Sequence, residues 1–337
     1  MIVDIPTVER LCANGCFVVL FFTTLYYWSK ILFTGEVHYS QTGLVGYGTA
    51  VFCLTAHLLL RWFDSGHFPL SNLYESLIFL AWCLLILHIF IENSLKTLFL
   101  GVLTSPAILC LIAFTDFSLP SELQKSSPLV PALQSNWLVM HVTVMIASYA
   151  ALLLGCLAAL AYLILLWFIE NGTKISKSDF ALETPLSLGS ANPKQDNSLF
   201  STTSLSTSSS EKNFFQVFEK SSSQTNSQKS IKFLNFLDNL SYRTIGIGFC
   251  FLTLGILSGA VWANETWGNY WSWDPKETWA FITWLTFATY LHSRLIGGWS
   301  GSKSAWIASF GFVIVWICYL GVNLLGQGLH SYGFLQI

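Results

Sequence analysis

The chain has 337 residues, of which 53% are hydrophobic and only 10% are charged. A soluble domain carries about 25% charged residues, so most of this chain belongs in a lipid bilayer. The formal net charge of −2 gives no sign of nucleic acid as a partner. The eight cysteines form no CxxC or CxxCH pattern, which argues against a zinc ribbon, a thioredoxin-type redox pair and covalent haem attachment to this chain.

Eight apolar stretches are long enough to cross the membrane, because a spanning helix needs about 20 mostly apolar residues. They lie at residues 12–33, 43–62, 73–91, 97–115, 137–168, 243–263, 278–297 and 304–325. The fifth is longer than a bilayer requires, so we expect it to tilt or to extend into solvent. The N-terminal MIVDIPTVER has the wrong charge for a cleavable signal peptide, so the first stretch is expected to remain a helix. The expected fold is an all-α integral membrane protein.

A polar segment divides the chain into three regions. Residues 1–170 hold five expected helices, residues 171–240 are rich in Ser, Thr, Asn and Lys, and residues 241–337 hold three helices. A segment of such low complexity buries too little apolar surface to offset its ordering entropy, so we predict a mostly disordered polar loop. The short stretch 213–218 is expected to be part of this linker, with contact to the membrane surface as the alternative.

Lysine and arginine are unevenly distributed across the expected membrane. Eight crossings put both termini on one side, here called side P, and leave side N opposite. The basic residues of side P are Arg10, Arg61, Lys125 and Lys276. Those of side N are Lys30, Lys96, Arg243, Arg294, Lys303 and the lysines of the polar segment. By the positive-inside rule, side N is predicted to be stromal or cytoplasmic and side P lumenal or periplasmic.

An aromatic cluster lies on side P, between the sixth and seventh stretches. Residues 267–279 contain four tryptophans and one tyrosine, interrupted by glycine and asparagine. An aromatic belt would spread over both membrane interfaces and several helices. This local cluster instead predicts a platform for a flat apolar ligand.

The end of the cluster has the pattern of a helix start. Asp274, Pro275 and Glu277 match the N-cap, N1 and N3 positions of a helix. They are therefore predicted to cap the seventh helix, a role that is compatible with contact to a ligand.

The stretch 267–277, WGNYWSWDPKE, resembles the tryptophan-rich WWD motif of the haem-handling protein superfamily. Residues 68–76, FPLSNLYES, and residues 326–333, GQGLHSYG, resemble elements of the CcsA (ResC-like) family of System II cytochrome c biogenesis proteins. The SNLYES part also fits a helix start, capped by Ser71 or Asn72. The resemblance covers nearly all of the membrane part and leaves out residues 171–240.

The resemblance implies a haem site in this loop. Haem b, bound transiently and without a covalent bond, would dock on Trp267, Trp271 and Trp273. Lys276 either meets a haem propionate or extends along apolar surface toward water. The motif residues expected at this site are Trp267, Gly268, Tyr270, Trp271, Trp273, Asp274 and Lys276.

Two histidines on side P are the expected axial ligands, because six-coordinate haem iron commonly takes two imidazoles. His141 stands at the side-P end of the fifth stretch and His330 just past the eighth, and both positions match the pair that the resemblance implies. His292, near side N, suggests a second site or a path. The resemblance implies that it receives haem from side N, with a mate from a CcsB/ResB-type partner subunit. His57 is the weaker alternative ligand.

The remaining histidines are assigned to structural roles. His38 and His88 are expected at the membrane interface. His67 precedes the FPLSNLYES stretch and is expected to pack that loop.

The function implied by the resemblance is haem attachment in cytochrome c biogenesis. Haem would move from side N to the Trp-rich loop and then to the CxxCH motif of an apocytochrome c, with cytochrome f and a soluble lumenal cytochrome c as acceptors. The chain would act with a CcsB/ResB-type membrane subunit, and no side chain is expected to serve as an obligatory acid or base. The implied location is the chloroplast thylakoid membrane, with a cyanobacterial thylakoid or bacterial plasma membrane as the alternative.

Three other functions compete with this one. A b-type haem electron-transfer subunit would also use histidine pairs, but no expected helix carries two histidines. A transporter for another solute would show internal repeats or broken helices, which are not evident. A scaffold subunit would need no tryptophan cluster. Two observations would separate these four functions. They are whether the purified protein contains haem, and whether deletion of the protein abolishes all c-type cytochromes.

Overall fold

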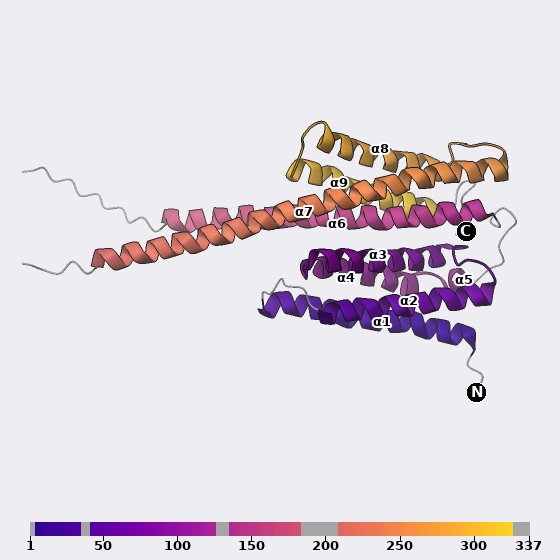
Figure 1. The fold of residues 1–337 in the computed structure, drawn as a ribbon, viewed down its shortest axis with the longest axis horizontal. Helices are drawn as coiled ribbons and strands as arrows, with labels where there is room; N and C mark the ends of the chain where they lie inside the picture. Colours follow the sequence, from indigo (N-terminus) through magenta and orange to yellow (C-terminus); the bar gives the residue numbers. More distant parts are fainter. Residues whose placement is uncertain (1–3, 35–40, 126–134, 183–207, 326–337) are drawn as a thin grey trace, which may run out of the picture.

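The computed structural model describes residues 4–34, 41–125, 135–182 and 208–325, and these form an all-helical bundle (Figure 1). The long helices are α1 (Ile5–Ser29), α2 (Gln41–Ser65), α3 (Leu73–Leu95), α4 (Phe99–Ala113), α6 (Asn136–Leu182), α7 (Ser208–Trp267), α8 (Pro275–Leu295) and α9 (Ser302–Trp316). The short elements are the helices α5 (Ser121–Gln124) and α10 (Val322–Leu325) and the π-helical turns η1 (Lys30–Thr34), η2 (Phe114–Ser118) and η4 (Ile317–Gly321).

The predicted membrane-protein fold is confirmed. Within the described residues, seven helices are long and apolar enough to cross a membrane. The exception among the eight expected stretches is α8, which is long enough at 21 residues but carries His292, Arg294 and several threonines. It packs on α7 and α9 within the same bundle, so its polar composition is accommodated beside the seven apolar helices (Figure 1).

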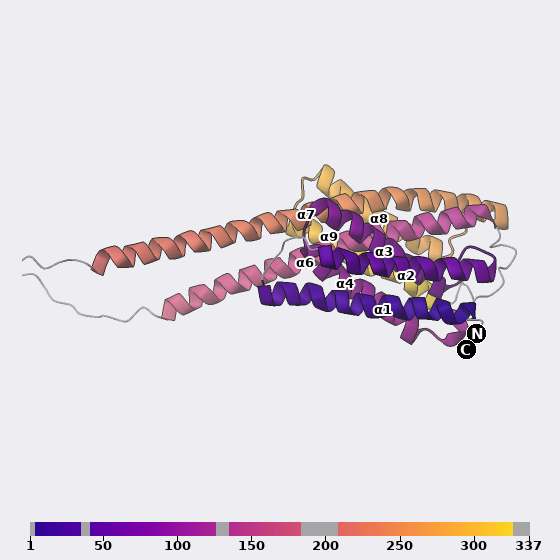
Figure 2. The same cartoon turned by 60° about the horizontal axis from the view of Figure 1, so that its bottom comes forward.

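The polar segment differs from the prediction at both of its ends. Helix α6 continues to Leu182 and α7 begins at Ser208, and both helices project beyond the rest of the bundle (Figures 1 and 2). The later part of the segment is helical because its leucines recur on one side of the helix and are buried. They are Leu234, Leu237 and Leu240. The backbone of residues 213–218 is part of helix α7, but their side chains are not among those described. Residues 183–207 lie outside the described residues altogether.

Helix α6 is the centre of the bundle. It packs along α7, and its other neighbours are α3, α4 and α9. A side chain at Gly248 of α7 would meet Leu152 at 2.8 Å, and one at Gly255 would meet Met145 at 2.5 Å. Small residues let two helix backbones approach closely, so these glycines determine how α7 lies against α6.

A buried polar network joins α1, α2, α3 and α4 in the side-N half of the bundle. His88 hydrogen-bonds to Glu92 through Nε2 and to Thr104 Oγ1 through Nδ1, the latter at 2.8 Å. Tyr27 donates to both Glu92 oxygens at 2.9 Å. The Tyr47 ring stacks on the His88 ring with centroids 3.8 Å apart. The predicted interfacial position of His88 is therefore wrong, because its side chain is fully buried among partners from distant parts of the chain.

A second buried network ties the side-P ends of α1, α2, α3 and α5 together. Arg61 donates to Glu9 Oε1 and to Glu75 Oε1, at 2.7 Å each. Its Nη2 also donates to the backbone carbonyl of Gln124 at 2.8 Å. Glu75 in turn accepts from the backbone N–H and the hydroxyl of Ser71, at 2.6 and 2.8 Å. One guanidinium thus compensates two buried carboxylates and fixes the start of α3.

His57 belongs to this second network. Its ring is 1% exposed. Nδ1 lies 3.1 Å from the Glu9 carbonyl oxygen, and Nε2 lies 3.8 Å from Glu9 Oε1. This position is among the α1, α2 and α3 side chains, and His57 is not one of the residues that line the pocket described below.

Candidate functional site

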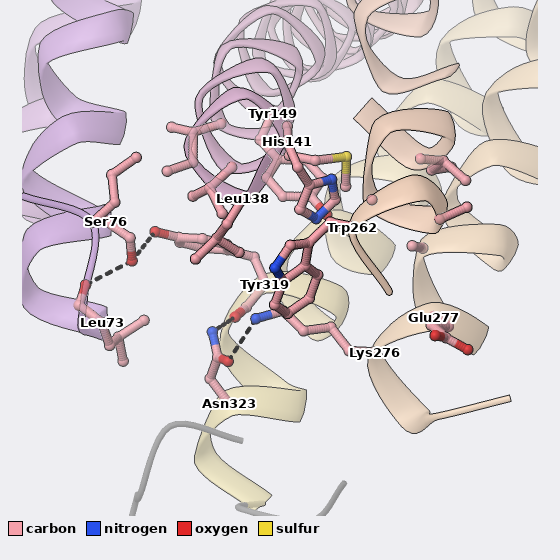
Figure 3. A pocket seen from close by; sticks show the side chains of 18 of the residues that line it. Leu73, Ser76, Leu138, His141, Tyr149, Trp262, Lys276, Glu277, Tyr319 and Asn323 are labelled. Carbon is pink, nitrogen blue, oxygen red and sulfur yellow. Dashed lines mark hydrogen bonds between the residues drawn. The ribbon is translucent and has the colours of Figure 1, made fainter. Parts of the chain in front are cut away.

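A pocket opens at the side-P end of the bundle between α3, α6, α7, α8 and η4 (Figure 3). It holds about 1050 Å³ of empty space, including the part open to solvent. Much of the wall is apolar and comes from α6 and α7. These residues are Leu138, Val142, Met145, Ile146, Ile256 and Ala260.

His141 enters the pocket from α6 in a fixed orientation. Its Nδ1 lies 2.7 Å from the Gly255 carbonyl oxygen of α7. Because a carbonyl oxygen accepts, Nδ1 carries the hydrogen, and in the neutral ring the lone pair is then on Nε2. The imidazole lies nearly parallel to the Trp262 ring, at 8° with centroids 6.5 Å apart. A neutral imidazole oriented by a carbonyl is the usual arrangement of an iron ligand.

Glycine at position 259 makes this approach of His141 to α7 possible. A Cβ at Gly259 would lie 2.5 Å from His141 Cε1 and 2.6 Å from Nδ1. Gly259 also lines the pocket.

The loop from α7 to α8 is held by the first turn of α8. Asp274 caps this helix, accepting from the Lys276 backbone N–H at 3.3 Å, and Glu277 completes a capping box. Glu277 also accepts from the Ser272 backbone N–H at 2.8 Å. The predicted capping role of Asp274 and Glu277 is confirmed. Trp273 has a φ of +58°, a conformation that costs a non-glycine residue about 1–3 kcal/mol, and these bonds help to hold it there.

Three of the motif residues line the pocket, namely Tyr270, Trp271 and Lys276. The other four stand outside the lining. Trp267 packs edge-on against Trp262 at 4.8 Å, and Trp273 packs edge-on against Trp271 at 5.8 Å, so each supports a ring that does line it. Gly268 makes the turn after α7 with a φ of +78°. Asp274 caps α8 from a buried position.

Several lining residues were missed by the sequence analysis. Trp262 is 1% exposed and faces His141. Tyr319 of η4 and Asn323 of α10 line the opposite edge. Trp262 stands five residues before the motif and could have been grouped with it. Tyr319 and Asn323 lie inside an apolar stretch that gives no signal of a site.

Of the other predicted ligands, the two that lie within the described residues, His57 and His292, do not line this pocket. His292 is exposed near the C-terminal end of α8, at the opposite end of the bundle. His330 and His38 lie outside the described residues. His67 is half-buried beside the FPLSNLYES stretch, with Nδ1 3.2 Å from the Phe68 carbonyl oxygen.

The site therefore combines an oriented imidazole, aromatic rings and a lysine in one apolar pocket of a multi-pass membrane protein. Such a set suits a flat, apolar ligand that carries a metal and an acidic edge.

Residues 70–330 match the cytochrome c assembly protein family. The chain is 68% identical over 337 residues to the cytochrome c biogenesis protein CcsA of Chlorella vulgaris, with all of both chains covered. It is 48% identical to the CcsA of Marchantia polymorpha, over 98% of each chain, and 46% identical to that of Crocosphaera subtropica, over 98% and 99%. The chain belongs to the cytochrome c assembly protein family.

A solved structure shares the fold. It is the cytochrome c heme lyase CcmF, with a TM-score of 0.57 at 14% sequence identity. The alignment covers 94% of this chain and 46% of that one, so the chain spans about half the length of this structural relative.

Proposed function

We propose that this protein serves the haem-attachment step of cytochrome c biogenesis. It would bind haem b in the side-P pocket, without a covalent bond, and present it to the CxxCH motif of an apocytochrome c. The observation that carries the proposal is that His141, Trp262 and Trp271 meet in one pocket with Lys276 at its edge. The residues fit a haem, because the pocket offers an iron ligand, aromatic and apolar walls, and a cation.

The protein's part in the reaction is binding and orientation. His141 would bind the iron through Nε2, since Nδ1 is held by the Gly255 carbonyl. Trp262 and Trp271 would contact the haem and exclude water from it. His330, outside the described residues, is proposed as the second axial ligand. The acceptor's own histidine would then replace one of the two when haem departs.

The chemistry itself belongs to haem and acceptor. Each CxxCH thiol adds its sulfur to one carbon of a vinyl group and its hydrogen to the other, so the addition consumes no oxidant or reductant. Keeping the iron reduced favours attachment. We assign no residue of this chain as an acid or base in that step.

The other end of the bundle is the proposed entry for haem. His292 is exposed on α8 there, so a partner subunit could reach it. We propose that a CcsB/ResB-type subunit supplies the second ligand at that site. The proposed location is the chloroplast thylakoid membrane, with side P in the lumen and cytochrome f and a soluble cytochrome c as acceptors.

The pocket can be tested through Trp271. Replacing it with alanine removes a lining ring, which is worth about 1.5–3 kcal/mol when fully buried. We expect Trp271→Ala to lower the haem that co-purifies by about tenfold or more. Haem per protein is measured from the reduced absorption spectrum of detergent-purified samples.

The matched control for this test is Trp62→Ala. It removes a partly exposed ring from the side-P end of α2, outside the pocket lining, and should leave the haem content unchanged. Equal haem content in the two variants would count against this pocket as the haem site. A deletion strain that keeps its c-type cytochromes would instead favour a b-type electron-transfer subunit.

A further inference from the structure

The polar side chains of the pocket are unevenly placed. The α6 and α7 walls are mainly apolar apart from His141 and Tyr149, and Tyr270 comes from the loop before α8. The other polar lining residues belong to the start of α3, to α8, to η4 and to α10, and they are Asn72, Ser76, Lys276, Glu277, Tyr319 and Asn323. Among the described lining residues other than histidine, Lys276 is the one cation. A ligand in this pocket therefore meets a polar edge on one side.

This edge is connected by hydrogen bonds across three parts of the chain (Figure 3). Lys276 Nζ donates to Asn323 Oδ1 at 3.1 Å. Asn323 Nδ2 donates to the Tyr319 carbonyl at 2.6 Å, which fixes the direction of the amide. Tyr319 Oη donates to Ser76 Oγ at 2.9 Å, and Ser76 donates to the Leu73 carbonyl at 2.9 Å. These hydrogen bonds tie the edge together across the three parts of the chain.

Glu277, the acidic neighbour of Lys276 in the chain, also lines the pocket, but its carboxylate is hydrogen-bonded to the loop. Glu277 accepts from the backbone N–H groups of Ser272 and Asp274, at 2.8 and 3.3 Å. Figure 3 shows the Lys276 side chain extending toward Asn323 while the Glu277 carboxylate lies on the other side. The lysine is therefore directed to the pocket edge and the glutamate to the loop.

We propose that Lys276, Asn323 and Tyr319 form a carboxylate-recognition edge, which holds the two propionates of haem. This inference rests on the proposed function. Lys276 would give a charge-assisted hydrogen bond, and the second N–H of the Asn323 amide would give another. The Tyr319–Ser76 bond positions the edge by tying η4 to α3.

The edge sets the rotation of the haem in its own plane. Apolar walls and an axial histidine leave a flat ring free to turn about the iron–nitrogen bond. Carboxylates held at one place on the rim remove this freedom. The two vinyl groups then take a reproducible position for the thiols of the acceptor, which is what stereochemically uniform attachment needs.

Haem dimethyl ester tests this edge, because it keeps the ring, the iron and the vinyls but has no carboxylate. We would titrate both ligands into detergent-solubilised wild-type protein, Lys276→Gln, Asn323→Leu and Lys125→Gln. We expect the wild type to prefer haem by about ten- to a hundredfold, the strength of a hydrogen bond to a charged group. Lys276→Gln should remove most of this preference and Asn323→Leu part of it.

Affinity for the ester reports whether the pocket is intact, and it should stay within about twofold in every variant. Lys125→Gln removes an exposed charge from the same side of the membrane, outside the pocket lining, and should behave as wild type. Equal wild-type affinities for haem and ester would overturn the edge while leaving the haem site standing. The edge would also be overturned by a Lys276→Gln variant that keeps the preference for haem over its ester, or by one that loses affinity for both ligands equally. Wild-type protein that binds neither ligand would overturn the proposed function itself.

Discussion

Replacing Gly259 by valine is expected to abolish haem binding while the helical bundle still assembles. The new Cβ would lie 2.5 Å from His141 Cε1, closer than two non-bonded carbon atoms can approach. The imidazole cannot simply shift, because Gly255 holds its Nδ1 at 2.7 Å and the Trp262 ring faces it in parallel. Overpacking of this kind costs about 1–3 kcal/mol, which displaces the ring before it unfolds the protein.

The measurement is the haem content per purified protein, which should fall at least about tenfold. Gly246→Val is the matched control, since Gly246 lies on the same helix and a Cβ there meets no atom within 4 Å. It introduces the same β-branched residue without touching His141 and should keep its haem. A Gly259→Val protein with wild-type haem content would show that His141 does not need its observed position.

Replacing Arg61 by methionine is expected to prevent the protein from accumulating in the membrane. Arg61 compensates Glu9 and Glu75, and the Glu75 side chain is fully buried. Removing one partner of a buried ion pair costs about 3–5 kcal/mol, because the other charge is left unpaired. Folding stabilities are about 5–15 kcal/mol, so this loss is a large fraction of the total.

Protein level and thermal unfolding in detergent measure the effect. Arg10→Met serves as the control, because Arg10 is an exposed arginine at the same end of the bundle. Substitutions at such surface sites change stability by about 0.5 kcal/mol or less. If the two variants accumulate and unfold alike, the buried network does not stabilise the fold as argued above.

The structural features that could be predicted from the sequence are those that depend on neighbours in the chain. The order Asp274, Pro275, Glu277 defines a helix start through contacts within four residues, and the structure has that cap. The long apolar stretches likewise predict helices, because spanning a bilayer needs about 20 apolar residues in a row. Both inferences use only neighbours in the chain.

Features that depend on how helices pair could not be predicted in this way. His88 stands near the end of an apolar stretch, as an interfacial histidine would, but Tyr27 and Tyr47 from other helices enclose it. Tyr319 and Asn323 become part of the pocket only because η4 and α10 lie beside α3 and α8. Nothing in the amino-acid order around them indicates these partners.

The prediction of disorder from composition differs from the structure at the ends of the polar segment, for a related reason. Serine, lysine and asparagine dominate residues 171–240, and their average predicts disorder. Leu234 and Leu237 nevertheless recur on one side of a helix and are buried in the bundle core. An average over the segment hides this spacing, whereas tertiary packing depends on it.

The most direct test of haem binding at this pocket is the reduced visible spectrum of the detergent-purified protein with His141 replaced by alanine. Of the two expected axial ligands, His141 is the one within the described residues, and it lies in the pocket. We predict that the low-spin haem signal of the wild type is lost in His141→Ala and returns when imidazole is added. A haem signal unchanged by the substitution would contradict the assignment of His141 as an iron ligand.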